Sequence, residues 1–526
     1  MMLLNKVMCK HTTMRMSSSS SRIGSLPKRL PINRLQKSAE LIREEEDRAH
    51  RAISFLDSSP EPFHVVSTVI NRLERSGFKP LDESLLWKKS QLIKKGGKYY
   101  FTRNGSTIVA FTVGGKFVPG NGFKVIGAHT DSPNLKLKPR SKKSGSGLIQ
   151  LNVETYGGGL WHTWFDRDLS IAGRVILRNS IDNSKFEHRI IKIDRPVLRV
   201  PNLCIHLRTP EERDAFKVNK EDHLAPILCD EIEKSLSKKD DKENNDEVEN
   251  LETETDQWAT EQQPELLELL ASELKCSVED IVDFELSLYD TQKASINGMR
   301  NEFLCSSRID NLASVFVAVE ALETHANEYL TDDEDIAMVA FFDHEEVGSD
   351  SNPGAGSTIM RDAVERISNA LVDAPEDNEL FKAALAKSLI LSVDMAHAVH
   401  PNYASKHEKS HSPKMNAGVV IKQNQNQRYA TNGLTGFFVR EMGRRSGIPI
   451  QEFAVRNDCP CGSTIGPIIS ANTGIRAVDL GMPQLSMHSI REMMGISDIT
   501  FAYKLFSTFF KSFRDLDSSI KIEKTT

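Results

Sequence analysis

Four ionisable side chains follow one another at Asp343, His344, Glu345 and Glu346, directly after the apolar run 338–342. That run predicts a buried parallel strand, because both of its faces are apolar. Open α/β sheets place their chemistry just beyond the carboxyl ends of such strands. Two adjacent glutamates cannot share one face of an extended segment. We therefore expect different roles for Glu345 and Glu346, one holding a metal ion and the other moving a proton. The alternative is a solvated turn at a strand end.

Residues of the same kind occur at other element ends. His129 and Asp131 follow a predicted strand at 124–128, and Asp394 follows a predicted strand ending at 393. Asp310 stands at the start of a helix, and His488 is the last histidine of the chain. A histidine can bind a metal ion through one ring nitrogen while a nearby carboxylate accepts the other ring proton. Taken singly, His129 also fits a surface histidine, and Asp310 also fits a helix N-cap.

These residues converge if the strands form an open α/β sheet, because the strand ends then meet at one edge. Two histidines with several carboxylates form a ligand set that suits Zn²⁺, Mn²⁺ or Co²⁺. One acid shared by two ions, with a spare glutamate as base, is the arrangement of a two-metal hydrolase. The sequence therefore predicts a two-metal centre.

Two further patterns imitate metal sites. His407, Glu408 and His411 match the HExxH pattern, which needs a helix with an apolar face behind it. This segment has no apolar stripe and is bracketed by prolines, so an HExxH-type zinc peptidase is a minor alternative. Cys459 and Cys461 lack a second Cys/His pair at zinc-finger spacing, which argues against a structural zinc ion.

The composition describes an ordinary globular chain. Its 526 residues are enough for two or three domains of roughly 150–200 residues each. Hydrophobic residues make up 39%, charged residues make up 27%, and the net charge of −6 gives no bias towards nucleic acid or a membrane surface. No apolar run reaches the roughly 18 residues of a membrane span, so we expect neither partner. Seven cysteines without a regular framework indicate a reducing compartment, and we expect a cytoplasmic protein.

The first 38 residues differ from the rest. They contain eight Lys or Arg, no Asp or Glu, and a run of serines at 17–21. This composition is typical of an organelle transit segment and also of a disordered extension, and Met16 offers a downstream start. Organelle import is expected only if residues 1–38 act as a transit segment.

The remaining chain shows an α/β pattern interrupted by a β-rich one. Before residue 139 we expect a helix after Pro62 and strands at 99–102, 107–113 and 124–128. Residues 140–295 predict strands at 148–153, 171–177 and 188–193, an acidic loop at 235–256, and helices at 265–274 and 278–286. The α/β pattern then returns, and a closing helix at 500–516 carries a stripe of phenylalanines that we expect in the core.

Six motifs carry a resemblance to a known family. In chain order they are GAHTDSP at 127–133, YGGGLWHTWFDRDL at 156–169, RIDNL at 308–312, DHEEVGS at 343–349, DMAHAVHPNY at 394–403 and LSMHSIRE at 485–492. Over most of residues 50–516 the chain resembles the aspartyl aminopeptidase family of metallopeptidases, peptidase family M18. The resemblance implies an α/β fold: a zinc-peptidase (phosphorylase/hydrolase-like) catalytic domain in two parts, 39–139 and 296–520. A β-rich dimerisation domain, 140–295, is inserted between them, and residues 1–38 form a disordered or targeting extension.

The resemblance also implies the metal ligands. Two zinc ions per subunit are expected, with Mn²⁺ or Co²⁺ as alternatives. His129 and Asp394 would hold one ion, Glu346 and His488 would hold the other, and Asp310 would bridge them.

Further roles follow from the same resemblance. Glu345 would be the catalytic base that takes a proton from the attacking water, and Asp131 would lie behind His129. The residues expected to contact substrate are Glu345, Asp394, His397, Lys422 and Tyr429, with His206 entering from a neighbouring subunit.

The implied activity is the release of N-terminal Asp or Glu from peptides. The implied assembly is a homo-oligomer, a tetrahedral dodecamer. His344 departs from the family pattern, because many relatives carry Asn there. A different class of function stays open, namely a non-catalytic assembly or cargo shell that retains only the fold.

Overall fold

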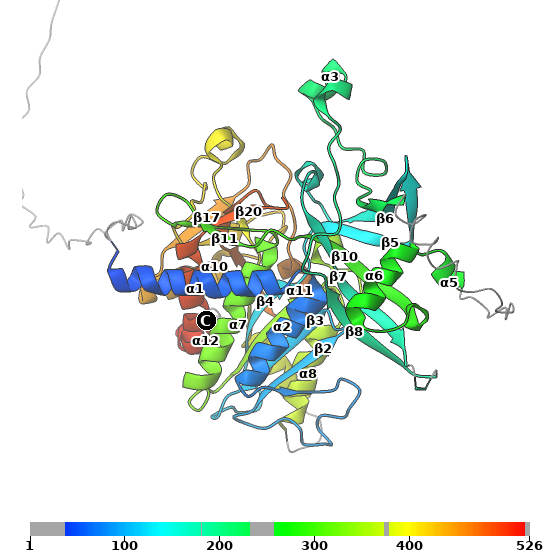
Figure 1. Cartoon of the computed structure of the whole chain (residues 1–526). Coiled ribbons are helices and arrows are strands. Elements are labelled where there is room, and N and C mark those ends of the chain that lie inside the picture. Colours follow the sequence, from blue (N-terminus) through cyan, green and yellow to red (C-terminus); the bar gives the residue numbers. More distant parts are fainter. Residues whose placement is uncertain (1–36, 180, 183, 232–256, 373–377, 521–526) are drawn as a thin grey trace, which may run out of the picture.

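The structure is a computed structural model that describes residues 37–179, 181–182, 184–231, 257–372 and 378–520. Its described strands form three sheets, of nine, six and five strands. Figure 1 shows the nine-stranded sheet in the body of the molecule and the six-stranded sheet beside it. A narrow arm that carries α3 (Pro210–Asp214) rises from the region of the six-stranded sheet.

The nine-stranded sheet is the centre of the fold. β13 and β14 pair in parallel with β4 from its two sides, and β13 pairs antiparallel with β3. The strand predicted at 338–342 is therefore parallel to one neighbour and antiparallel to the other. Every residue of β13 is buried, as its two apolar faces require. In spatial order the strands are β1 (Lys79–Pro80), β2 (Lys98–Arg103), β3 (Thr107–Val113), β13 (Ile336–Phe342), β4 (Phe123–His129), β14 (Leu389–Val393), β18 (Arg476–Gly481), β16 (Val419–Gln423) and β17 (Ile450–Ala454).

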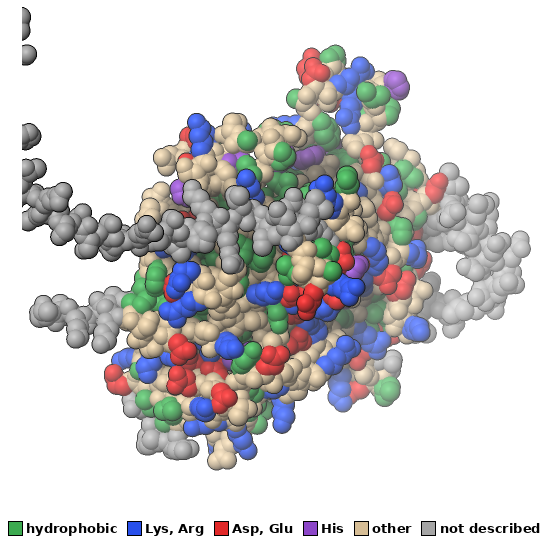
Figure 2. All heavy atoms as spheres, turned by 90° about the vertical axis from the view of Figure 1, so that its left-hand side faces the viewer, with side chains coloured by type: hydrophobic (Ala, Val, Ile, Leu, Met, Phe, Trp, Pro, Cys, Tyr) green, Lys and Arg blue, Asp and Glu red, His purple; other side chains and the backbone are tan. Residues whose placement is uncertain are grey.

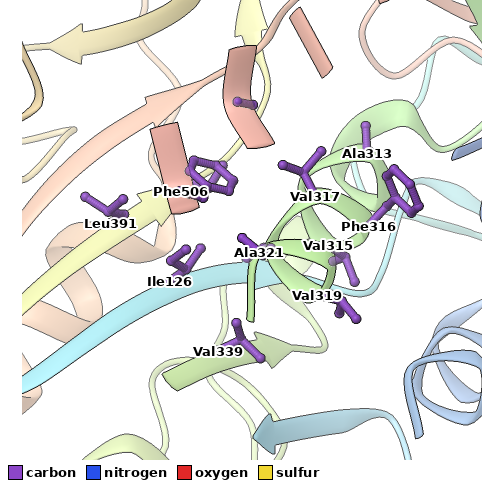
Figure 3. Packing of buried hydrophobic residues seen from close by; sticks show 14 of the residues in the cluster. Ile126, Ala313, Val315, Phe316, Val317, Val319, Ala321, Val339, Leu391 and Phe506 are labelled. Atoms are coloured by element: carbon purple, nitrogen blue, oxygen red, sulfur yellow. The ribbon is translucent and has the colours of Figure 1, made fainter. Parts of the chain in front are cut away.

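Helices cover both faces of this sheet. Figure 3 shows α7 lying over β4 and β13, with Val319 close to Val339 and with Phe506 of α12 nearby. The phenylalanine stripe of the closing helix is confirmed as core, because Phe506, Phe509, Phe510 and Phe513 are fully buried. One face packs against α1 (Ala39–Ser58), α2 (Pro62–Arg75), α7 (Ile309–Glu328), α10 (Gly433–Ser446) and α12 (Ile496–Ser518), and the other against α8 (Ile359–Ala370), α9 (Asn378–Ala386) and α11 (Ile465–Thr473).

The six-stranded sheet is built entirely from residues 134–290. The helix predicted at 265–274 is confirmed as α6 (Pro264–Leu274), whose Leu266, Leu267 and Leu270 join the core of this sheet. The predicted domain boundary at 139/140 falls inside β5. In spatial order the strands are β8 (Phe186–Lys192), β7 (Leu169–Arg178), β10 (Ile281–Asp290), β5 (Asn134–Gly145), β6 (Leu148–Tyr156) and β9 (Ile227–Asp230).

The helix predicted at 278–286 is wrong. Only Val278–Asp280 form a short 3-10 turn, and β10 begins at Ile281. β10 lies inside the sheet: it pairs antiparallel with β7 along its length and with β5 at Ser287. Pairing with these distant strands decides the conformation against the local helical spacing of apolar residues.

A small five-stranded sheet brings three distant segments to the end of the large sheet. β15 lies just after Asp394, β12 just before Asp310, and β19 and β20 on either side of His488. The strands in spatial order are β11 (Ser295–Asn297), β12 (Phe303–Ser306), β20 (Glu492–Gly495), β19 (Pro483–Leu485) and β15 (Ala396–His397).

The arm, defined here as residues 201–224, carries exposed apolar side chains at Leu203, Ile205, Leu207 and Phe216. Figure 2 shows the arm as a knob above the body. On the surface of the body, charged side chains of both signs are interspersed. At the amino end, the Ser38 hydroxyl accepts the Leu41 N–H at 3.2 Å and caps α1. Residues 1–36 and the predicted acidic loop lie outside the described residues. Among those described, none of the helices has the length and apolarity to span a membrane.

Candidate metal centre

Two strand ends and the two segments beside them converge as the sequence predicts. His129 ends β4, and Asp394 follows β14. His129 Nε2 lies 3.4 Å from Asp310 Oδ1 and 3.5 Å from Asp394 Oδ1. His488 Nε2 lies 3.5 Å from Asp310 Oδ2 and 3.3 Å from Glu346 Oε1. Two ligand groups therefore adjoin, and Asp310 offers one carboxylate oxygen to each.

Backbone carbonyl groups orient both histidines. His129 Nδ1 lies 3.0 Å from the carbonyl oxygen of Asp131, and His488 Nδ1 lies 3.1 Å from that of Gly158. A carbonyl oxygen can only accept, so each Nδ1 carries the donated proton. The Nε2 lone pair of each ring is then directed at the carboxylates, which is how metal-binding histidines are commonly held.

The residues present fit a pair of divalent cations. Asp310 Oδ1 and Glu346 Oε1 are buried polar atoms without a hydrogen-bond partner among the described residues. In the groups His129–Asp310–Asp394 and Asp310–Glu346–His488, the ligand atoms lie within 4.8 Å of one another. Nitrogen and oxygen ligands in these numbers suit Zn²⁺, and a cation would satisfy the two orphaned oxygens.

Crowding shifts the pKa values in the cluster. Burial raises the pKa of Glu346 to about 7, and the nearby Asp310 acts in the same direction. Burial also raises the pKa of Glu345 well above its ordinary value. Burial alone would lower the pKa of His488, but the carboxylates of Asp310 and Glu346 beside its Nε2 raise that pKa to about 12. The cluster therefore binds protons that a divalent cation would displace.

Asp131 supports the turn that follows β13. Its Oδ1 accepts the Glu345 N–H at 3.1 Å, and its Oδ2 accepts the Glu346 N–H at 3.1 Å and the Tyr156 hydroxyl at 2.7 Å. Its carboxylate also lies 3.4 Å from His129 Nδ1. Asp131 thus lies behind His129 and fixes the direction of both glutamates.

Known proteins match the chain over nearly all of its length. A family profile described as "Aminopeptidase I zinc metalloprotease (M18)" matches residues 55–510. The chain belongs to the M18 family. It is 47% identical over 480 residues to the probable aspartyl aminopeptidase of Ricinus communis, covering 90% of this chain and 96% of that protein. It is 44% identical to the aspartyl aminopeptidase of Dictyostelium discoideum, covering 89% of this chain and 97% of that protein.

Solved M18 structures show the same fold. A structure of an Ape4 and Nbr1 complex matches with a TM-score of 0.85 at 41% identity, over 93% of this chain and 90% of that one. The Saccharomyces cerevisiae mApe1 dodecamer matches with a TM-score of 0.77 at 31% identity, over 90% and 99%. The predicted α/β zinc-peptidase fold is thereby confirmed. The chain is a metallo-aminopeptidase, as predicted, and the non-catalytic shell is not favoured.

A cavity of about 240 Å³ lies beside the M18 centre, with His397 and Tyr429 in its wall. Lys422 is buried next to Tyr429: its ammonium lies 5.6 Å from the Tyr429 ring centroid and donates to Asp394 Oδ2 at 2.9 Å. Burial alone would raise the pKa of Asp394, but the Lys422 charge and His129 outweigh it and hold that pKa well below its usual range. Desolvation and the charge of Lys422 lower the pKa of His397 to about 4.

His206 is not brought to this centre within one chain. It lies in the short 3-10 turn Ile205–Leu207 of the arm and is exposed. His344 also takes no part in either ligand group, since its Nδ1 is bonded to the Ser351 hydroxyl at 2.7 Å.

The HExxH alternative is wrong. His407 follows the 3-10 segment Pro401–Lys406 and its Nε2 accepts the His400 N–H at 3.1 Å, while His411 is paired with Glu408 at 2.6 Å. The two histidines therefore do not share a helical face. The Asp310 carboxylate is directed at His129 and His488, which argues against the N-cap alternative.

Sequence reasoning missed two supporting residues of the M18 centre. Tyr156 holds Asp131, as described above. Glu492 is 2% exposed, and it accepts the Asp310 N–H at 2.9 Å and the His488 N–H at 2.8 Å. Both lie inside motifs that carry the family resemblance, but nothing in residue type or spacing shows which ligand each supports.

Proposed function

We propose that this chain uses two zinc ions per subunit to release N-terminal Asp or Glu from peptides. The two ligand groups that share Asp310 carry this proposal, because each of its oxygens faces a different histidine. His129 and Asp394 hold one ion, Glu346 and His488 hold the other, and Asp310 bridges them. The relatives named aspartyl aminopeptidase support the preference for acidic residues.

Glu345 acts as the general base. When bound, the ions polarise the scissile carbonyl and make water a stronger acid. Glu345 Oε2 lies 4.0 Å from His129 Nε2. Glu345 forms a third possible ligand group with His129 and Glu346, but it belongs to neither group built on Asp310 and holds no ion in this proposal. Its carboxylate is therefore available to take a proton from the attacking water and to pass it to the leaving amine.

The cavity beside the centre supports recognition of an acidic side chain. Lys406 lies in its wall together with His397 and Tyr429. Arg456 lies there too but is paired with Asp458 at 2.6 Å, and Glu408 adds a negative charge. The ammonium of Lys422 has three donors, and Asp394 occupies one of them. Lys406 in the wall and the buried Lys422 are the positive charges that favour Asp or Glu over a neutral residue here.

We further propose that the subunits form a homo-oligomer, a tetrahedral dodecamer. The arm exposes Leu203, Ile205 and Leu207 around His206, and burial of such a patch against a neighbour is favourable. The mApe1 relative is described as a dodecamer. In the proposed assembly the arm of one subunit carries His206 into the site of the next.

Substrates that differ only in their first residue test the activity. We expect the kcat/KM of zinc-loaded protein on Asp and Glu substrates to exceed that on Ala, Leu and Lys substrates by about tenfold or more, the effect of one charge-assisted contact. Metal analysis should give two zinc ions per subunit, and native mass spectrometry should give a dodecamer. Equal rates on acidic and neutral substrates would remove the acidic assignment. A single zinc ion would remove the bridging role of Asp310.

A cytoplasmic location stays a prediction from the cysteine content. Imaging the full chain and a form without residues 1–38 tests it. Organelle targeting that is lost on deletion would identify the extension as a transit segment.

A further inference from the structure

Asp479 is a buried carboxylate that lies outside both ligand groups. It belongs to β18 and is fully shielded from solvent. Among the described residues, none of the candidate metal-binding groups includes it. A buried carboxylate is unfavourable unless hydrogen bonds satisfy it, so its partners indicate its role.

Asp479 ties two irregular segments to the sheet. Its Oδ2 accepts the Ala430 N–H at 2.6 Å, and its Oδ1 accepts the Thr464 hydroxyl at 2.6 Å. Its own N–H donates to the Thr431 hydroxyl oxygen at 2.9 Å. One residue of a central strand therefore fixes both 430–431 and 464.

These two segments both contribute to the cavity wall. Tyr429 lines the cavity immediately before Ala430, and Pro460, Cys461 and Gly462 line it just before Thr464. Arg428 joins the segments directly, since its Nε donates to the Cys461 carbonyl at 3.1 Å. Residues 424–432 and 455–464 belong to no helix or strand, so backbone pairing does not hold them in place.

The packing around the carboxylate leaves room for it and little else. Gly466 lies in the first turn of α11, and a Cβ there would lie 2.4 Å from Asp479 Oδ2. Thr464 is the N-cap of the same helix, and the N-terminus of a helix favours negative charge. Burial raises the pKa of Asp479, while its bonds from Thr464 and Ala430 and the charge of Lys422 oppose the rise.

We propose that Asp479 is a positioning residue for substrate recognition. It holds Tyr429 and the wall at 460–462 at the spacing that receives the first side chain of the substrate. The inference rests on the proposed function only for the identity of that side chain. Loss of the Asp479 carboxylate therefore loosens the wall and weakens substrate binding, while the metal ligands stay in place.

The variant Asp479→Asn tests this role. The amide keeps the shape of the carboxylate but removes the negative charge that strengthens both bonds, and it keeps the bond to Thr464 only if that hydroxyl turns to accept from the amide NH₂. We expect KM for the preferred substrate to rise about tenfold or more, with kcat changed less and zinc content unchanged. Hydrogen exchange should become faster in residues 424–432 and 455–464.

Asp498→Asn is the matched control. Asp498 is also fully buried and accepts the Gly418 N–H at 2.9 Å, but it does not line the cavity. We expect this variant to lower the thermal midpoint and to leave KM and exchange at 424–432 unchanged. A rise of KM in both variants would show a general effect of lost buried charge and would overturn the proposal.

Thr464→Val removes one of the two bonds and keeps the carboxylate, so it decides the matter if Asp479→Asn does not fold. A higher KM and faster exchange at 455–464 support the proposal. If the variant that folds has the same KM and the same hydrogen exchange as the parent protein, the proposal is overturned, even if the thermal stability falls. The substrate panel of the parent enzyme tests the acidic preference separately. Asp479 is then judged on whichever first residue the parent prefers.

Discussion

Glu492 offers a direct test of how the metal centre is held. Its buried carboxylate accepts the N–H groups of Asp310 and His488 through different oxygens, at 2.9 and 2.8 Å. These two residues come from distant parts of the chain and meet in one ligand group. Glu492→Gln keeps the size of the side chain but leaves one of the two N–H groups opposite an amide donor.

The expected loss follows from one hydrogen bond to a charged acceptor, and it applies above about pH 8, because burial raises the pKa of Glu492 to about 8. Such a bond contributes about 1.5–3 kcal/mol. At about 1.4 kcal/mol per factor of ten, this corresponds to roughly 10–150-fold in an equilibrium constant. The loss falls on metal affinity, because the displaced backbone belongs to Asp310 and His488. Residues that support metal ligands typically contribute about 10–100-fold to affinity, which agrees with this range.

Competition with a chromophoric zinc chelator measures the effect. We expect Glu492→Gln to bind at least one zinc ion about 10–100-fold more weakly than the parent. Asp335→Asn is the control: Asp335 is also fully buried, and it binds Arg514 at 2.9 Å just before β13, away from the strand ends. This control should lower stability without changing zinc affinity. Parent zinc affinity in Glu492→Gln would refute the supporting role.

Three other outcomes follow from the centre and the core. Glu345→Gln should lower kcat by about 10²–10⁴ and leave zinc content unchanged in metal analysis, whereas parent activity would refute its role as base. The pKa values of Glu346 (about 7) and His488 (about 12) are raised in the metal-free fold. In the unfolded chain the glutamate releases its proton above about pH 4 and the histidine above about pH 6.5, so the fold keeps protons that the unfolded chain has lost. Calorimetry should therefore show metal-free stability falling, and zinc affinity rising, between about pH 5 and 8. A zinc affinity independent of pH would contradict this. His411→Ala should keep full activity, since His411 lies outside both ligand groups, and a dead variant would restore the HExxH alternative.

The strand-end residues of the site can be predicted from sequence for a physical reason. β4, β13 and β14 are adjacent and parallel, so the residues that follow them must emerge at one edge. His129, Glu346 and Asp394 are of this kind. Asp310 is different, because a helix start predicts a cap equally well, and only the small sheet shows that its carboxylate faces two histidines.

The error at 278–286 has a related cause. Val278, Ile281, Val282 and Leu286 recur at helical spacing, so a local reading favours a helix. The segment nevertheless pairs with β7 over most of its length, and β7 lies more than 100 residues earlier in the chain. A local pattern cannot reveal pairing between strands that are so far apart in the chain. The neighbouring α6 is predicted correctly because a helix forms its backbone hydrogen bonds within its own segment.

Much of what orients the centre is backbone, and this limits what residue types can reveal. The carbonyl groups of Asp131 and Gly158 set both imidazole rings, and N–H groups of Asp310 and His488 hold Glu492 in turn. Every residue carries such groups, so their role is a property of the path of the chain and leaves no mark on composition. Gly157 is an exception: its φ of +75° favours glycine, and a Cβ there would lie 3.1 Å from the Glu346 Cβ, which is tighter than an ordinary contact. The glycine run at 157–159 is therefore a sequence feature that indicates a loop passing close to the metal ligands.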